Sequence, residues 1–209
     1  KILKYIPDNK LLKFLNKNVL YPALKKGNFK TKYSGVLEYG RNISSSFFLV
    51  RSLFLPNEIK EIISDSAFKR GFDELNLFDN CKKDIEEFSD EKLSIMYLEI
   101  KYYLCSKLLR DADWASMAHS VELRTPFVDW VFFNKIIPLL KLDKNINKKN
   151  TLDCVKEKIP NEIYNRKKTG FTIPHEQYLK HFSVKRKFLN PIRDWSLLSY
   201  KKYLEKNAI

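Results

Sequence analysis

The chain has 209 residues, of which 44% are hydrophobic and 14% aromatic, and this composition excludes a disordered protein. Its 39 Lys and Arg residues outnumber its 25 Asp and Glu residues, which gives a formal net charge of +14 and favours phosphate-bearing or acidic partners. The apolar runs are too short to span a bilayer, and residues 1–8 are not followed by the apolar stretch of a signal peptide. We therefore expect a cytoplasmic protein with no membrane partner.

Proline, glycine and capping residues divide the chain into short helical stretches. Residues 1–32 predict short surface helices, residues 27–46 predict a loop, and residues 47–54 fit either the end of a buried helix or a short strand. A helix is expected from Pro56 to about Gly71. Further helices are expected before and after Ser89 and over about residues 129–140, 145–159, 161–166 and 174–182, followed by a basic tail with Trp195 and Tyr200 as anchors.

The clearest helix follows Ser89, because Ser89-Asp90-Glu91 supplies a cap and an acidic first turn. Its apolar residues recur at three- and four-residue steps, and this stripe predicts a core-facing surface. The stripe consists of Leu93, Met96, Tyr97, Ile100, Leu104 and Leu108.

Cysteine and histidine residues do not form a metal-binding pattern. The three cysteines, Cys81, Cys105 and Cys154, have neither a zinc spacing nor a redox-pair spacing, so we expect free, mostly buried thiols. The histidines are scattered as well, and we expect no metal site in this chain. The nearest approach to a phosphate loop, between Gly35 and Gly40, lacks the Lys and Ser/Thr that should follow the second glycine.

Residues 108–129 concentrate acids, hydroxyls, a histidine and two arginines directly after the apolar helix. One interpretation is a buried polar network in which carboxylates satisfy Arg124 and loop amides. The other interpretation is one wall of a functional site. The residues alone leave both open.

Two longer patterns resemble a known family. Residues 116–129 resemble the SMAHSxExRxPFxD signature of the glutamine-dependent asparagine synthetase family, and residues 165–174 resemble its RxKxGFxxP turn. Residues 48–58 are similar to the segment that precedes a helix in this family. The resemblance covers about residues 47–182.

The resemblance implies a ligase. Its synthetase domain binds ATP, magnesium and aspartate, adenylates the side-chain carboxylate, and releases pyrophosphate. Ammonia from an N-terminal glutaminase domain then displaces AMP. Lys168 matches the family lysine that stabilises the adenylation transition state and pyrophosphate, so the resemblance implies that Lys168 is catalytic.

Other matching positions are implied to form a wall of the substrate and pyrophosphate site. They are Asp113, Ser116, Glu122, Arg124, Asp129, Arg166 and Gly170. Trp114 and Asp111 depart from the Arg and Lys common in the family. The amidated carboxylate is therefore expected to be aspartate or a relative of it.

Three family features are absent from the sequence: the SGGxDS nucleotide loop, the N-terminal cysteine nucleophile and the acidic GDGGDE-type stretch. We expect an all-α chain, the helical C-terminal portion of an α/β ATP-pyrophosphatase (adenine nucleotide alpha hydrolase-like) synthetase domain whose parallel sheet lies elsewhere. We expect the chain alone to be inactive and to bind neither ATP nor magnesium. Its expected partners are the missing nucleotide-binding and glutaminase regions, in the same gene or a separate chain, and small-molecule substrates.

These patterns predict a single helical domain over residues 1–209. It would comprise an irregular basic N-terminal segment (1–46), a core resembling asparagine synthetase (47–182) and a basic tail (183–209). Two alternatives remain: a degenerate interaction module whose basic face docks an acidic partner, and a basic nucleic-acid-binding domain. The second is disfavoured because no groove-reading or base-stacking motif accompanies the charge.

Overall fold

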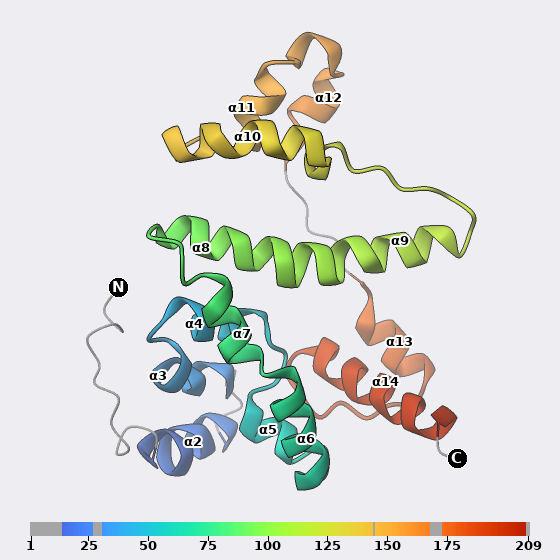
Figure 1. The fold of residues 1–209 in the computed structure, drawn as a ribbon. Helices are drawn as coiled ribbons and strands as arrows, with labels where there is room; N and C mark the ends of the chain where they lie inside the picture. Colours follow the sequence, from blue (N-terminus) through green and yellow to red (C-terminus); the bar gives the residue numbers. More distant parts are fainter. Residues whose placement is uncertain (1–13, 27–30, 144, 168–172, 208–209) are drawn as a thin grey trace. The chain divides into compact units, whose positions relative to one another are not determined.

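The computed structural model describes residues 14–26, 31–143, 145–167 and 173–207. These residues form helices joined by turns and contain no strand, so the all-α prediction is confirmed for them (Figure 1). None of the helices in this part of the chain has both the length and the apolar character needed to cross a bilayer.

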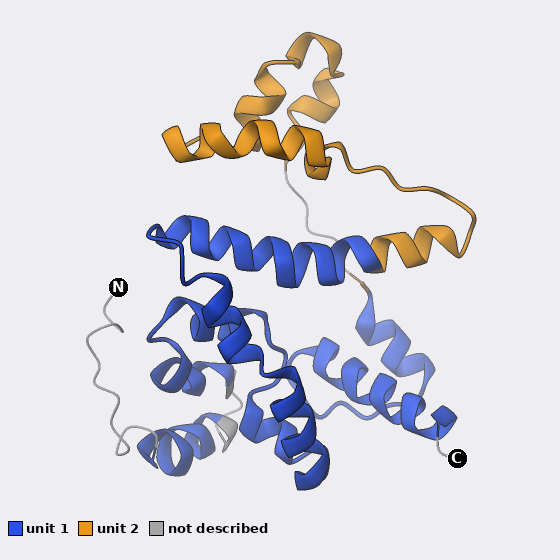
Figure 2. Cartoon of the chain, viewed as in Figure 1, with its two compact units in different colours: residues 1–110, 174–209 blue, residues 111–173 orange. Residues whose placement is uncertain are grey.

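The contacts gather the chain into two compact units (Figure 2). Unit 1 comprises residues 1–110 and 174–209, and unit 2 comprises residues 111–173. The predicted partition at residues 46 and 182 stays a prediction. Unit 1 contains η2 (Asn16–Leu20), α2 (Tyr21–Lys26), η3 (Thr31–Gly35), α3 (Val36–Tyr39), α4 (Ile43–Arg51), α5 (Pro56–Lys60), α6 (Asp65–Leu75), α7 (Leu77–Asp84), α8 (Glu91–Leu98), η4 (Glu99–Leu109), α13 (His175–His181) and α14 (Pro191–Asn207). Unit 2 contains most of α9 (Arg110–Met117), then η5 (Pro126–Val128), α10 (Trp130–Leu142), α11 (Lys148–Asp153), η6 (Lys156–Lys158) and α12 (Asn161–Tyr164).

The core of unit 1 forms where α4, α7 and α8 meet. Phe47, Cys81 and Leu98 are each at most 9% exposed and make one cluster. At its edge the Tyr102 hydroxyl donates to Asp84 Oδ2 at 2.6 Å, and Lys101 Nζ donates to Asp84 Oδ1 at 2.6 Å. Burial opposes ionisation of Asp84, but these two donors outweigh it and lower the pKa of the carboxyl. The core and its polar edge thus tie η4 to α7.

The predicted core stripe of the long helix is only partly covered, because four of its six residues are half-buried, two are exposed and none is buried. The buried residues of α8 are Ser94 and Leu98, one turn apart, whereas Tyr97 and Leu108 are 36% and 42% exposed. α8 packs against α4, and the small Ser94 side chain allows a close approach. Beyond Leu98 the helix continues as the π-helical η4, whose wider turn shifts the side chains relative to an α-helical repeat.

The described part of the predicted loop 27–46 is helical instead. It forms η3, α3 and the start of α4. Asn42 Oδ1 accepts a hydrogen bond from the Ser45 amide at 2.9 Å, and the Ser45 hydroxyl donates to the Tyr39 carbonyl at 2.6 Å. The serines therefore begin a helix rather than extend a loop, and the open choice for residues 47–54 is decided as helix up to Arg51.

Two smaller predictions also need correction. The helix expected from Pro56 to Gly71 is two helices, because Ser64 accepts the Ala67 amide at 3.3 Å and starts α6 anew. All three cysteines are free as expected, but only Cys81 is buried, whereas Cys105 and Cys154 are exposed.

Gly35 is a test of the packing between η3 and its neighbours. A Cβ at Gly35 would lie 2.8 Å from Leu49 Cδ1 and 3.0 Å from Leu55 Cδ2. Gly35→Ala should therefore lower the free energy of unfolding by about 1–2 kcal/mol through overpacking. Gly71→Ala in α6 is the matched control, because nothing lies within 4 Å of its Cβ position, and it should raise stability by about 0.5–1 kcal/mol. Urea unfolding of both variants measures these changes in the free energy of unfolding. A Gly35→Ala variant as stable as the wild type, or more stable, would contradict the close packing of Leu49 and Leu55 around Gly35.

Candidate functional site

Two of the predicted site residues lie on α9 of unit 2. Asp113 is exposed and Ser116 is half-buried. The Ser116 hydroxyl donates to the backbone carbonyl of Asp113 at 3.1 Å, which is a local bond within the helix. Ser116 therefore bonds to the backbone of Asp113 and not to its exposed carboxylate.

Glu122 and Arg124 form the ion pair that the polar-network interpretation predicted, but the pair is not buried. Arg124 Nε donates to Glu122 Oε1 at 3.0 Å and Arg124 Nη2 donates to Oε2 at 3.2 Å, while the side chains are 83% and 68% exposed. The neighbouring residues of this stretch, 117–127, are exposed as well. An exposed pair contributes at most about 1 kcal/mol, so here it orients Arg124 more than it stabilises the fold.

Asp129 has a clear structural role. Its Oδ1 accepts the Phe132 amide at 2.9 Å and caps the N-terminus of α10. The Phe127 and Phe132 rings meet edge to face with centroids 5.9 Å apart, which fixes the turn into the helix. Asp129 is exposed, so this bond is a local helix cap and not part of the buried network that one interpretation expected.

The second signature is described only in part. Arg166 is exposed and follows α12, where its amide donates to the Ile163 carbonyl at 3.3 Å. Lys168 and Gly170 lie outside the described residues. Within the described part of unit 2, no hydrogen bond or ion pair joins Asp113, Asp129 and Arg166 to one another.

Unit 2 leaves large apolar side chains uncovered. None of its described residues is buried, and Trp114, Trp130 and Leu142 are 64%, 73% and 85% exposed. These side chains are spread over α9 and both ends of α10, and the absence of any buried residue among the described residues of unit 2 is the stronger sign of a surface that another polypeptide covers. Unit 2 therefore presents side chains suited to a covering layer.

Unit 1 contains a buried ion pair that sequence reasoning missed. Arg193 Nη2 of α14 lies 2.7 Å from Glu58 Oε1 of α5, and the two side chains are only 13% and 7% exposed. The Arg193 guanidinium lies over the rings of Phe54 and Phe188, at 4.3 Å from each centroid. The other carboxylate oxygen of Glu58 accepts the Leu55 amide at 2.8 Å. The pair therefore joins the C-terminal helix to the start of α5.

Burial and neighbouring charges shift the pKa values of two groups near this pair, Tyr21 and Lys32. Burial raises the pKa of Tyr21 to about 12, and the negative charges of Glu58 and Glu61 add to this effect. Burial lowers the pKa of Lys32, as do the charges of Arg51 and Arg193. Lys32 Nζ donates to the carbonyls of Val50 at 2.6 Å and Ser52 at 3.0 Å, where α4 ends.

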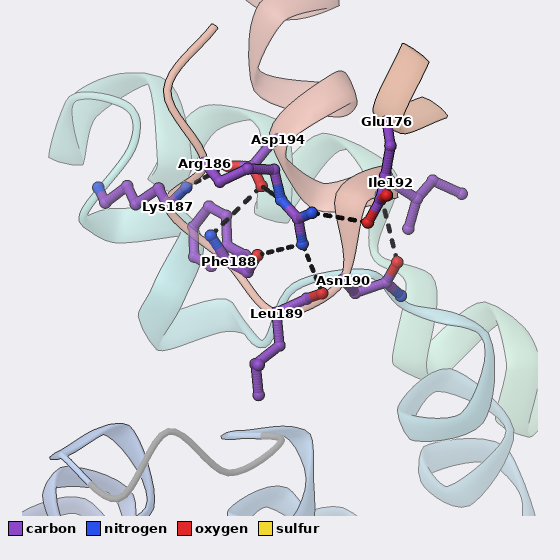
Figure 3. Close-up of polar contacts among 8 residues, drawn as sticks. All are labelled: Glu176, Arg186, Lys187, Phe188, Leu189, Asn190, Ile192 and Asp194. Carbon is purple, nitrogen blue, oxygen red and sulfur yellow. Dashed lines mark hydrogen bonds and ion pairs between the residues drawn. The ribbon is translucent and has the colours of Figure 1, made fainter. Parts of the chain in front are cut away.

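Arg186 is the centre of a second polar cluster in unit 1 (Figure 3). Its guanidinium bonds to carboxylates on α13 and α14 and to two backbone carbonyls. The partners are Glu176 Oε1 at 2.8 Å, Asp194 Oδ2 at 3.3 Å, and the carbonyls of Phe188 at 2.9 Å and Leu189 at 2.7 Å. The cluster therefore fixes the turn between the two helices.

The sequence assigned both arginines to a basic tail. One signal in the sequence distinguishes Arg186 and Arg193 from ordinary surface charge. Phe188 lies two residues after Arg186 and Asp194 directly follows Arg193, whereas a solvated basic tail has no use for an aromatic or an acidic neighbour. The expectation that Trp195 anchors the tail is confirmed, since its ring packs against Tyr178 of α13 at 5.6 Å. Tyr200, the other expected anchor, is 36% exposed.

The all-α fold and the two signatures describe a helical portion of a synthetase domain. Comparison with known proteins agrees: the family model described as asparagine synthase matches residues 20–207, and the chain belongs to this family. Over 90 residues it is 34% identical to the glutamine-hydrolyzing asparagine synthetase 1 of Bacillus subtilis (strain 168). That match covers 42% of this chain and 14% of the relative. No solved structure matches the chain.

Removing the buried ion pair should destabilise unit 1. Arg193→Met leaves the Glu58 carboxylate buried without its cation, so the free energy of unfolding should fall by about 3–5 kcal/mol. Lys202→Met on the same helix is the control, because it removes only the ion pair between Lys202 and Glu205, both of which are 62% exposed. It should change the free energy of unfolding by less than about 0.5 kcal/mol. Chemical denaturation compares the two, and equal midpoints would contradict the role of Arg193.

Proposed function

We propose that the chain is the C-terminal helical portion of an ATP-dependent amidotransferase. The enzyme would adenylate a carboxylate, aspartate or a relative of it, and amidate it with ammonia derived from glutamine. Membership of the asparagine synthase family supports this proposal most strongly, since the match spans residues 20–207 and includes both signatures. The chemistry requires positive charge against the phosphate groups and a shaped acceptor site.

Within this proposal Lys168 is the catalytic residue. A flexible ammonium next to a glycine turn can follow the phosphate charge as it develops in the transition state. The wall residues shape the floor of the site: Asp113, Ser116, Glu122, Arg124, Asp129, Arg166 and Gly170. The capping bond of Asp129 and the fork of Arg124 on Glu122 support that positioning role.

We propose that this chain does not hold ATP or magnesium by itself. In the described ranges no three His, Cys, Asp or Glu side chains gather into a metal-binding group, and the sequence contains no phosphate loop. We propose that the nucleotide and its metal are held by the nucleotide-binding region, and that ammonia comes from the glutaminase region. These regions would be parts of the same gene product or a separate chain.

The uncovered apolar side chains of unit 2 support a partner of this kind. Trp130 and Leu142, at opposite ends of α10, are 73% and 85% exposed, so the described residues leave both ends of this helix uncovered. Burying them would contribute about 1.5–3 kcal/mol for each side chain. An isolated interaction module would show the same surface, and activity measurements separate the two functions.

The first test is nucleotide binding. The 209-residue chain should not bind ATP with magnesium, because its sequence contains no phosphate loop and its described residues hold no metal-binding group. The full-length protein should bind ATP under the same conditions. Equilibrium dialysis with labelled ATP would measure both, and micromolar binding by the 209-residue chain would contradict the proposal.

The second test is Lys168 in the full-length protein. Lys168→Ala should lower kcat about 10²–10³-fold, the usual cost of removing a transition-state charge donor, with little change in melting temperature. Lys167→Ala is the matched control, because this neighbouring lysine does not match the signature. Turnover should be followed as pyrophosphate release and amide formation. Normal turnover in Lys168→Ala would overturn the catalytic assignment, and so would equal losses in both variants.

A further inference from the structure

The turn at the end of α9 joins two groups of proposed wall residues. Asp113 and Ser116 lie on α9, whereas Glu122 and Arg124 lie in the non-helical stretch that leads from this helix to α10 (Figure 1). All four residues belong to unit 2. The turn between the helix and the stretch therefore sets how the two groups lie relative to one another.

Two backbone hydrogen bonds close this turn. The Val121 amide donates to the Ser116 carbonyl at 3.1 Å, and the Ser120 amide donates to the Met117 carbonyl at 3.0 Å. These bonds form a Schellman motif, in which the residue directly after the helix cap adopts the left-handed conformation. That residue is Ser120, whose φ is 56°. The direction of the chain after α9 thus depends on the left-handed backbone of Ser120.

The stretch after Ser120 is exposed along its whole length. Residues 121–125 belong to no helix and none of them is buried. The ion pair between Glu122 and Arg124 is internal to the stretch, so it does not attach the stretch to α9. The next fixed point is the cap that Asp129 provides for α10. The conformation of Ser120 is therefore what sets the place of the ion pair relative to α9 in the described residues.

Serine is not the residue that best suits this conformation. In the left-handed region a Cβ atom crowds the following carbonyl, and glycine, which has no Cβ, is the usual residue at this position of the motif. A β-branched residue such as valine is disfavoured there most strongly. The fraction of molecules with a closed turn is therefore sensitive to the residue at position 120.

We propose that Ser120 is a positioning residue for the carboxylate site of the proposed reaction. Its left-handed backbone holds the pair of Glu122 and Arg124 in a fixed place relative to the wall residues of α9, and Ser120 does not itself touch substrate. The inference rests on the proposed function. Because the substrate binds molecules in which the turn is closed, opening the turn weakens apparent affinity but leaves the rate at saturation unchanged.

Two substitutions change this conformation in opposite directions. Ser120→Val disfavours the left-handed region, whereas Ser120→Gly favours it. Ser120 is exposed, so neither variant removes or overfills a packed core.

A matched control stands at the end of α13 in unit 1. Ser183 has a φ of 53°, and its amide donates to the Lys180 carbonyl at 2.9 Å. The Val184 amide donates to the Leu179 carbonyl at 2.9 Å, which completes a second Schellman motif. Ser183→Val therefore strains the same motif outside the proposed wall.

The experiment uses the full-length protein and measures kcat, amide hydrogen exchange over residues 117–124, and the KM for the carboxylate that the wild type amidates, aspartate or glutamate. Ser120→Val should raise this KM about 10-fold and keep kcat within about 3-fold of wild type. Ser120→Gly should restore KM to within about 3-fold of wild type, and Ser183→Val should match wild type in both constants. Exchange over residues 117–124 should accelerate only in Ser120→Val. Partial unfolding would instead reduce the amount of active enzyme and lower kcat at an unchanged KM.

The possible failures are distinguishable. An unchanged KM in Ser120→Val would overturn the positioning role, whether or not exchange accelerates, and would leave the proposed function standing. Equal rises in KM in Ser120→Val and Ser120→Gly would also overturn it, because the lost hydroxyl and not the backbone conformation would then be responsible. An equal rise in Ser183→Val would show a general effect of strain and overturn it too. A full-length wild type that amidates neither carboxylate in the presence of ATP would overturn the proposed function, and the positioning role with it.

Discussion

The buried pair between Arg193 and Glu58 is the contact on which the C-terminal part of unit 1 depends. Burying two charges is costly, and their mutual attraction together with further contacts offsets that cost. Here the Leu55 amide bonds to the carboxylate, and the rings of Phe54 and Phe188 lie on the guanidinium at 4.3 Å each. The aromatic faces add a cation–π attraction of about 0.5–2 kcal/mol each in a desolvated setting. The first turn of α14 is thereby held against the first turn of α5.

The order in α13 follows from that contact. Asp194 is the residue after Arg193, so once Arg193 is held by Glu58, the Asp194 carboxylate is held as well, and it accepts Arg186 and two backbone amides. Arg186 in turn reaches Glu176 on α13. The chain of contacts thus runs from α5 through α14 to the end of the signature at Pro174. Removing the Glu58 carboxylate would therefore loosen α13 through Arg193, Asp194 and Arg186, without a direct contact between Glu58 and α13 in this series.

The two units differ in how much of their apolar surface is covered. Unit 1 encloses Phe47, Cys81 and Leu98, whereas no described residue of unit 2 is buried. The signature residues that match the family are in the uncovered unit or at its junction with α13. Under the proposed function, another region of the synthetase would cover this open surface and complete the site.

The sequence by itself determined where several helices begin, which family the chain belongs to and one local ion pair. The cap before α8, the start of α10 at Asp129 and the break at Pro174 were predictable, because each depends on residues within one helical turn. The two signatures identified the family for the same reason, since each is a continuous run. The pairing of Glu122 with Arg124 was also predictable, because the two residues lie side by side on an extended stretch.

Only the tertiary structure decided what is buried and which distant residues meet. The apolar stripe after Ser89 is only half-buried at four of its six positions, because α8 packs on α4 through Ser94 and Leu98, which lie beside the stripe. The exposure of Arg124 and the burial of Arg193 could not be read from residue type, since an arginine looks the same in either setting. The physical reason is that burial depends on elements far away in sequence. Local patterns determine where helices begin and end, but not which face another helix will cover.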